Sequence, residues 1–330
     1  MNRTSTIGML LGLAAVTALV AWQGVATVGG ALASIGWGML LFIVIYLPHL
    51  VLGTISWRLL FDAGRAPRIG PAIYAVWIGG SVNWLLPVAS IGGELVKARL
   101  VMNRGVRETD AGASIVVDKT VQALSIVLWV LIGLCLLVWL KPDPPLMVGV
   151  FLGLVLFTGT LFIFLAIQRA GAFGFLSGTI ARLSGSAFWH RVAGKADQMD
   201  ATIRALYDRP VRITCSVLLR LGARLALAGE VWLAAYLMGA PIGVVEAVML
   251  KSLAAGARSA AFTIPGGLGA QEAGFMVFGA LVGLTPELML SISLATRVRE
   301  LMIGLPGLIA WQLIEGRALA TRGRAGPSSD

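Results

Sequence analysis

The sequence predicts an all-α integral membrane protein with about six full transmembrane helices and two re-entrant helical hairpins of opposite orientation. The chain is 58% hydrophobic and 13% charged, whereas soluble domains carry about 25% charged residues. Several apolar runs approach the roughly 20 residues that cross a bilayer as a helix. Two broken, charged stretches, residues 81–99 and 259–272, interrupt these runs. The composition therefore indicates a membrane protein, and the interrupted stretches indicate the hairpins.

Residues typical of catalytic and metal sites are sparse. The two cysteines, Cys135 and Cys215, lie in apolar runs and have no metal-binding spacing, and His49 and His190 stand apart. No phosphate-binding loop is present, so ATP is not expected as the energy source. We expect no catalytic residues, no metal, no cofactor and no enzymatic activity. The net charge of +10 indicates basic cytoplasmic loops rather than nucleic-acid binding.

The first two apolar runs predict two spans. Residues 7–28 form the first span. A cleaved signal peptide is the alternative there, because residues 31–33 read Ala-Leu-Ala and resemble a cleavage site. Residues 35–61 form the second span, and Pro48 within it should kink the helix.

Residues 72–86 are too short for a comfortable span, and Pro87 and a basic stretch follow them. A full crossing would place that basic stretch outside, against the usual bias of Lys and Arg toward the cytoplasm. A hairpin that enters from the cytoplasm and breaks near Pro87 removes the conflict. Irregular backbone at that depth is tolerated where protein buries it or where it lines a wet cavity. Residues 111–140 then cross, and residues 146–167 return.

Residues 169–210 are the only sizeable polar segment. Apolar residues recur in it at three- and four-residue spacing: Trp189, Val192, Ala196, Met199, Ile203 and Leu206. This pattern predicts an amphipathic helix. We expect that helix on the inner membrane surface. The alternative is a helix that caps the bundle without lipid contact.

The rest of the chain follows the plan of the first half. Residues 211–238 cross, and residues 244–264 lead to the second break. Residues 266–284 return as a hairpin entered from outside, and residues 287–315 form the last span. A polar cytoplasmic tail, residues 316–330, follows.

Three residues of the first broken stretch recur 178 positions later: Ser81, Pro87 and Glu94 match Ser259, Pro265 and Glu272. We interpret residues 35–140 and 211–315 as the halves of an inverted repeat within one membrane domain, residues 1–315. Most of the 26 Lys and Arg residues then lie at the cytoplasmic face. This places both termini in the cytoplasm.

Charged side chains inside the predicted membrane segments are the candidate site. A charge at the bilayer centre costs about 2.5–3.5 kcal/mol, so such groups must pair or face water or a polar ligand. We expect substrate-binding side chains at Asn83, Glu94, Lys97, Asp118, Lys119, Arg220, Arg224, Arg258, Glu272, Arg297 and Glu300. The residues expected to break the hairpins are Pro87, Gly92, Gly93, Pro265, Gly266, Gly267 and Gly269.

Several of these residues have a purely structural alternative. Glu94 and Glu272 fall in the first turn after each break, where a carboxylate can simply cap the helix. Arg220 and Arg224 share a helix face, so they need an anion between them, either an acidic side chain or a lipid phosphate. A network of ion pairs without any ligand is the alternative for the whole set.

Two pairs of residues have simple geometric expectations. Asp118 and Lys119 are neighbours, so their side chains point about 100° apart on a helix and need not pair with each other. Arg297 and Glu300 are three positions apart, so they share a helix face and can pair.

Three motifs occur in order along the chain: PVASIGGE at 87–94, VVDKT at 116–120 and PGGLGAQE at 265–272. They resemble the flippase-like membrane proteins related to the membrane domain of lysylphosphatidylglycerol synthase, over most of the chain. The stretch SVNWLLPVASIGGELVKARL with VVDKT looks most like the branch associated with hopanoid biosynthesis in Gram-negative bacteria. The resemblance implies lipid translocation or trafficking. It does not imply lysyl transfer, because only about 15 polar residues follow Glu315.

We therefore expect a lipid transporter that moves a hopanoid or a phospholipid across or out of the inner membrane. Its expected partners are membrane lipids, together with lipid-biosynthesis or envelope-transport proteins. The alternative is a membrane scaffold that moves no lipid and recruits lipid-synthesis enzymes through residues 169–210. An intramembrane enzyme is a third, weaker option.

Overall fold

The computed structural model describes residues 35–62, 64–86, 92–142, 196–260 and 269–324, with residue 33 and several positions between 147 and 159. Residues 196–201 and 314–324 are described by their backbone alone. Regular structure throughout these ranges is helical, which confirms the predicted all-α class. The predicted first span, most of the span 146–167 and the prolines of both breaks lie outside the described residues.

The first half of the described chain contains a short 3-10 helix and four α-helices: η1 (Gly36–Gly38), α3 (Met39–Arg58), α4 (Ile69–Leu85), α5 (Gly92–Met102) and α6 (Glu108–Leu140). Two stretches, Gly36–Arg58 and Glu108–Leu140, are long and apolar enough to cross a membrane. Helix α4 has 17 residues and is about 26 Å long, slightly less than a hydrocarbon core of about 30 Å. The short third helix therefore has the length that the sequence predicted.

The second half contains five α-helices: α10 (Ala196–Tyr207), α11 (Pro210–Leu237), α12 (Val244–Ala260), α13 (Ala270–Leu281) and α14 (Pro286–Arg324). Helices α11 and α14 have 28 and 39 residues and exceed the length of a span. Both carry charged residues in their interior, among them Arg220 and Arg224 in α11. Helices α12 and α13 are short, with 17 and 12 residues.

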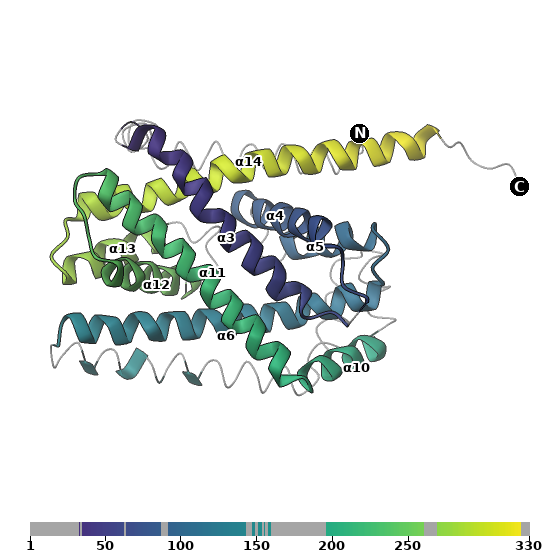
Figure 1. Cartoon of the computed structure of the whole chain (residues 1–330), viewed down its shortest axis with the longest axis horizontal. Helices are drawn as coiled ribbons and strands as arrows, with labels where there is room; N and C mark the ends of the chain where they lie inside the picture. The colour runs from purple at the N-terminus through teal and green to yellow at the C-terminus, as the bar shows by residue number, and fades with distance from the viewer. Residues whose placement is uncertain are drawn as a thin grey trace, which may run out of the picture.

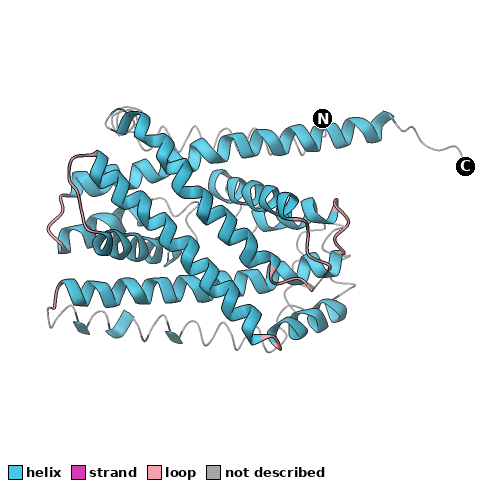
Figure 2. Ribbon diagram, viewed as in Figure 1, coloured by secondary structure: helices cyan, strands magenta, loops and turns pink. Residues whose placement is uncertain are grey.

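Helices α6 and α14 run along the long axis of the molecule, and the short helix pairs α4–α5 and α12–α13 lie toward opposite ends of it (Figure 1). Helices α6 and α14 run antiparallel, and α3 and α11 pack together and cross them obliquely. The pair α4–α5 packs on α14, and the pair α12–α13 packs against both α14 and α6. Connecting loops gather at the two ends of the bundle (Figure 2).

Helix α10 caps one end of the bundle. It packs against α6 and α11, and its side chains Ile203 and Leu206 are buried, at 7% and 6% exposure. They belong to an apolar core formed with α3, α5, α6 and α11. The Tyr207 hydroxyl also lies 2.7 Å from Thr120 Oγ1 on α6. The part of the apolar stripe whose side chains are described therefore contacts protein, as in the capping alternative; Trp189 and Val192 lie outside the described residues.

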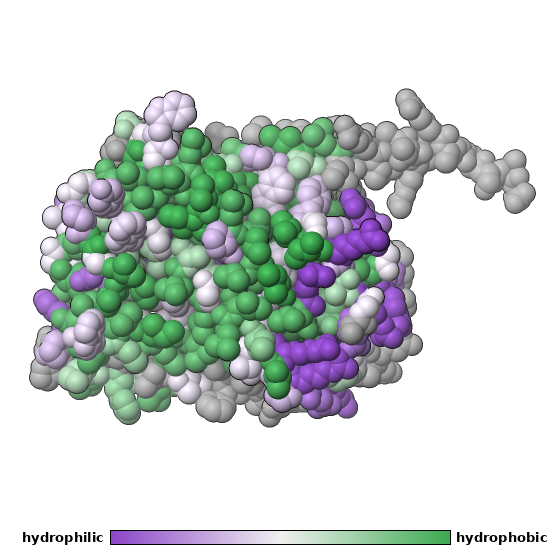
Figure 3. Space-filling view, in the orientation of Figure 1, coloured by the Kyte–Doolittle hydropathy of each residue, from purple (hydrophilic) through white to green (hydrophobic). Residues whose placement is uncertain are grey.

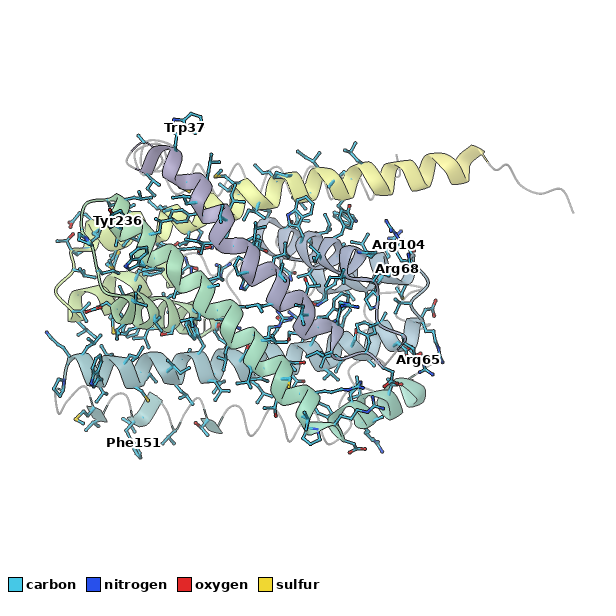
Figure 4. The ribbon with its side chains drawn as sticks, in the orientation of Figure 1. Trp37, Arg65, Arg68, Arg104, Phe151 and Tyr236 are labelled. Atoms are coloured by element: carbon cyan, nitrogen blue, oxygen red, sulfur yellow. The ribbon has the colours of Figure 1, made fainter. Side chains whose placement is uncertain are left out.

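The surface has the polarity of a membrane protein. Apolar side chains cover the middle of the visible face, and hydrophilic residues gather at one end (Figure 3). Arg65, Arg68 and Arg104 lie at that charged end, and Trp37 and Tyr236 lie at the other (Figure 4). Trp37 is 85% exposed and Tyr236 is 60% exposed, as is usual for aromatic residues at a membrane interface.

Candidate functional site

Five charged side chains from α5, α6 and α11 form a connected set of ion pairs, the first-half network: Glu94, Lys97, Asp118, Lys119 and Arg220. Lys97 Nζ lies 2.6 Å from Glu94 Oε2 and 2.6 Å from Asp118 Oδ2. Lys119 Nζ lies 3.0 Å from Glu94 Oε1. Arg220 Nη2 lies 2.6 Å from Asp118 Oδ1. As expected, Asp118 and Lys119 take different partners.

Neighbouring groups complete the surroundings of the two buried carboxylates. The Gln122 amide donates to Asp118 Oδ2 at 3.1 Å and to Glu94 Oε1 at 3.4 Å. The Lys97 ammonium also lies 4.5 Å from the centre of the Trp57 ring, where a cation–π contact stabilises it. The network therefore consists of charges that share partners, as buried charges require.

Close packing of α4 on α5 positions Glu94. The Gly93 N–H donates to Asn83 Oδ1 at 2.8 Å. A β-carbon on Gly93 would lie 2.0 Å from the carbonyl oxygen of Gly79, so only glycine allows this approach. Glu94 then falls in the first turn of α5, where the positive end of the helix dipole favours a carboxylate.

A second set of contacts links α12, α13 and α14, the second-half network: Arg258, Gln271, Glu272, Arg297 and Glu300. Arg297 Nε lies 3.1 Å from Glu272 Oε1, and Arg297 Nη1 lies 3.3 Å from Glu300 Oε2. Arg258 Nη1 lies 2.8 Å from Glu300 Oε1 and donates to Gln271 Oε1 at 2.9 Å. The expected pairing of Arg297 with Glu300 is confirmed.

Glu272 both caps its helix and belongs to this network. Its Oε2 accepts the N–H of Gly269 at 2.8 Å. Its Oε1 accepts from Arg297 and from the Ser293 hydroxyl, which lies 3.2 Å away. Gly269 has φ 79°, a left-handed conformation that glycine adopts readily, just before α13 begins. The capping role and the ion-pair role therefore coexist at this carboxylate.

A third ionic set, the Glu230 triad, joins α11, α12 and α14: Glu230, Lys251 and Arg299. Glu230 is fully buried, with Arg299 Nε at 3.0 Å and Lys251 Nζ at 3.3 Å. The Arg299 guanidinium also lies 5.2 Å from the Tyr46 ring and 5.3 Å from the Trp84 ring. This triad ties the two halves together through cation–π contacts.

Two ion pairs, one in each half of the sequence, have the same spacing along the chain. Glu94 pairs with Lys119, 25 residues later, at 3.0 Å. Glu272 pairs with Arg297, also 25 residues later, at 3.1 Å. The second pair lies 178 positions after the first in the sequence. Helices α6 and α14 also begin 178 residues apart, at Glu108 and Pro286.

The structure describes all eleven predicted site residues. Ten of them belong to the first-half or second-half network or support one of them. Asn83 supports the first-half network by holding the backbone of Gly93. Arg224 differs: its Nε donates to Ser125 Oγ at 3.3 Å, and among the described residues no carboxylate lies within 4.0 Å of it. Arg220 and Arg224 therefore do not share an acidic side chain.

The structure describes three of the seven residues that were predicted to break the hairpins. Gly92 and Gly93 begin α5, and Gly269 precedes α13. Pro87, Pro265, Gly266 and Gly267 lie outside the described residues.

Sequence reasoning left several members of these sets out of the predicted site, among them Lys251, Gln271 and Arg299. Lys251 is one of two cations in the apolar run 244–264, the other being Arg258, and a charge within such a run was a usable signal. Gln271 carries no charge, so only the packing of its helix identifies it, whereas Gln122 lies four positions after Asp118 and so shares its helix face.

The described residues contain no group of side chains suited to hold a metal ion. A hollow of about 270 Å³ lies apart from the networks, between the end of α3, the start of α6 and α10. It is lined by apolar side chains and by Asp62, Arg65, Asp110 and Arg209. Asp62 pairs there with Arg209, which joins the two halves at the charged end of the bundle.

The long apolar helices and the largely apolar face in Figure 3 are typical of a helical membrane protein. Within that class, the chain belongs to the family described as the lysylphosphatidylglycerol synthase TM region, whose model matches residues 9–307. This confirms the family resemblance seen in the three motifs. The match is to a flippase-like membrane region, and no catalytic domain was identified. No curated protein and no solved structure matched the chain significantly.

Proposed function

We propose that this protein moves lipids across or out of the bacterial inner membrane and binds the lipid head group among its interior charges. One observation carries the proposal, which is the concentration of charge inside an apolar bundle. The networks and Arg224 contribute eight cations: Lys97, Lys119, Arg220, Arg224, Lys251, Arg258, Arg297 and Arg299. They contribute five carboxylates: Glu94, Asp118, Glu230, Glu272 and Glu300.

These charges are costly, so their presence supports a function. Each unpaired charge at the bilayer centre costs about 2.5–3.5 kcal/mol on insertion scales. Ion pairs offset much of that cost but stabilise a fold less well than apolar packing of the same volume. Intramembrane charges therefore mark sites that handle polar ligands. A lipid head group is the polar ligand that a flippase-like membrane protein meets.

The proposed arrangement is an inverted repeat of residues 35–140 and 211–315, in which α4–α5 and α12–α13 are re-entrant hairpins. The separation of 178 residues between equivalent helix starts and equivalent ion pairs supports it. The antiparallel course of α6 and α14 in Figure 1 also supports it. Paired broken elements in corresponding halves are typical of transporter binding sites near the membrane midplane.

The proposed orientation places the charged end of the bundle in the cytoplasm. Arg65, Arg68 and Arg104 lie at that end (Figure 4), and cytoplasmic loops are rich in Lys and Arg. Both termini would then be cytoplasmic. The single membrane domain, residues 1–315, and the lipid-biosynthesis or envelope-transport partners stay predictions.

In the proposed mechanism, one half rocks against the other and exposes the head-group site alternately to each side. The Arg220–Asp118 ion pair and the Arg224–Ser125 hydrogen bond join the halves at the site. A head group that binds these cations competes with those contacts. Binding is thereby linked to the relative position of the two halves, while the lipid chains stay in the bilayer.

The scaffold alternative receives less support. It required the apolar stripe of residues 169–210 to meet a partner, yet Ile203 and Leu206 pack inside the bundle. The described part of this segment therefore leaves little of its stripe for recruitment.

Reconstitution tests the proposed function. Purified protein in vesicles should move a tail-labelled fluorescent phospholipid between leaflets, measured by bleaching with membrane-impermeant dithionite. A set of tail-labelled lipids with different head groups, including a hopanoid, identifies the cargo. Glu94→Gln should slow the transfer, with Asp208→Asn, an exposed change, as the control. Protein-free rates for every lipid would overturn the proposal.

A further inference from the structure

Among the described residues, Arg224 is the one cation in the middle of the bundle that has no carboxylate as an ion-pair partner. Its neighbour on the same helix face, Arg220, pairs with Asp118 at 2.6 Å. Arg224 contacts only the neutral Ser125 hydroxyl, through Nε at 3.3 Å. The Arg220 Nε is also buried without an acceptor. Two adjacent guanidinium groups therefore present donors that no described side chain satisfies.

Arg224 is partly buried and lies halfway along α11. It is 14 residues from Pro210 at the start of α11, about 21 Å along the helix axis. The whole helix is about 42 Å long on the same basis, so Arg224 sits at its middle. The His49 Nδ1 contacts the carbonyl oxygen of Ala223 at 3.0 Å, which fixes the adjacent backbone to α3. The guanidinium is therefore held near the midplane of the proposed span.

Charge is not distributed evenly among the three sets. In the second-half network, the two cations Arg258 and Arg297 balance the two carboxylates Glu272 and Glu300. In the Glu230 triad, two cations face one carboxylate. The first-half network with Arg224 has four cations, Lys97, Lys119, Arg220 and Arg224, against two carboxylates, Glu94 and Asp118. The first-half network together with Arg224 therefore carries a surplus of two positive charges.

We propose that Arg224, with Arg220 beside it, is the receptor for the phosphate of an anionic phospholipid. Guanidinium groups bind phosphate through paired, charge-assisted hydrogen bonds. A head group with a phosphate and no compensating amine brings the negative charge that the first-half network lacks. A zwitterionic head group would bring its own cation into a region already rich in cations. This inference rests on the proposed function and narrows the cargo to anionic phospholipids.

The selectivity of transfer tests the inference. Vesicles of phosphatidylcholine would carry the protein and a trace of tail-labelled phosphatidylglycerol or tail-labelled phosphatidylcholine. Wild-type protein should move phosphatidylglycerol faster. Arg224→Gln should slow phosphatidylglycerol by roughly ten- to hundredfold, the range for losing a charge-assisted hydrogen bond. Transfer of phosphatidylcholine, whose phosphate carries a compensating ammonium, should fall less, so that the preference for phosphatidylglycerol shrinks.

Two further variants sharpen the comparison. Arg224→Lys keeps the charge without the bidentate fork, so it should retain an intermediate rate. Arg204→Gln removes an exposed arginine from α10 and should behave as wild type. If Arg224→Gln does not fold, the Arg224→Lys rates and head-group-selective binding of short-chain phosphatidylglycerol to wild-type protein decide the case. Inorganic phosphate added at the same concentration distinguishes a lipid phosphate from a free one.

The outcomes separate the two proposals. Movement of no lipid overturns the proposed function. Movement of both lipids at equal rates, or an Arg224→Gln variant that keeps the preference for phosphatidylglycerol, overturns the phosphate receptor alone. Displacement of short-chain lipid by equal amounts of inorganic phosphate overturns the lipid as the specific ligand.

Discussion

Asp118 holds the first-half network together at the scale of single residues. It is fully buried and contacts two cations, Lys97 and Arg220, from different helices. Its two oxygens are divided between them, and Gln122 donates to the oxygen that Lys97 uses. Removing its charge leaves two buried cations with fewer partners, which is more costly than removing a whole ion pair.

Asp118→Asn should lower the free energy of unfolding by about 3–5 kcal/mol, the cost of breaking a buried ion pair by removing one partner. Denaturant unfolding in detergent micelles, followed by tryptophan fluorescence, measures the change. Asp208→Asn is the matched control, because Asp208 is exposed and lies in the turn between α10 and α11. Equal stability of the two variants would mean that Asp118 is not the structural centre of this network.

At this scale the sequence was informative where charge stood out against an apolar background. Glu94 and Glu272 were recognisable by their position after a break, and Lys119 and Arg297 as charges inside predicted membrane segments. The partners of each charge were harder to predict. Arg220 and Arg224 look alike in sequence, yet one has a carboxylate and the other has a serine hydroxyl. That difference depends on which helix faces α11, and a single sequence does not record it.

The pair α4–α5 shows how elements fix the site. Its helices approach so closely that a β-carbon on Gly93 would lie 2.0 Å from the Gly79 oxygen and 2.6 Å from the Asn83 side chain. The nearest neighbour at Gly80, on the other side of α4, is a Trp84 ring atom at 3.7 Å. The same substitution is therefore expected to have opposite consequences at two glycines of this helix pair.

Gly93→Ala should separate α4 from α5 and displace Glu94. It should lower the free energy of unfolding by at least about 1–3 kcal/mol, the range typical of overpacking. Gly80→Ala should be neutral or stabilising by up to about 1 kcal/mol, since alanine favours a helix. Unfolding in micelles and lipid transfer in vesicles measure both effects. Normal stability and transfer in Gly93→Ala would show that the close contact is not required.

Element lengths were predictable because apolar runs and their interruptions set them. The predicted segment 72–86 corresponds to Ile69–Leu85, and the predicted span 111–140 corresponds to Glu108–Leu140. The environment of α10 was not predictable in the same way. An apolar stripe fits a lipid surface or a protein surface equally well, and only the packing of Leu206 against the bundle distinguishes them.

The proposed orientation of the whole molecule in the membrane rests on its charged and aromatic ends. Lys141 lies at the end of α6 opposite to the arginine-rich end, and Arg104 lies in the turn between α5 and α6. In a background with Cys135 and Cys215 replaced by alanine, a membrane-impermeant maleimide should label Lys141→Cys in intact cells. It should label Arg104→Cys only after the membrane is permeabilised. The reverse pattern would invert the proposed topology.

The two halves are joined at the charged end by the ion pair between Asp62 on the α3 side and Arg209 before α11. If transfer requires the halves to rock, a covalent link at this place should stop it. A protein carrying Asp62→Cys and Arg209→Cys, in the same cysteine-free background, should lose lipid transfer on oxidation and regain it on reduction. The loss of lipid transfer should be nearly complete, because the cross-link fixes the two halves to each other at their charged end.

A link within one half provides the control for this experiment. Arg65 and Asp110 lie 4.0 Å apart in the same hollow, and both belong to the first half. A protein with Arg65→Cys and Asp110→Cys should therefore cross-link without losing transfer. Undiminished transfer in the cross-linked Asp62–Arg209 protein would contradict rocking of the halves. It would then require the head group to pass while the two halves stay fixed at their charged end.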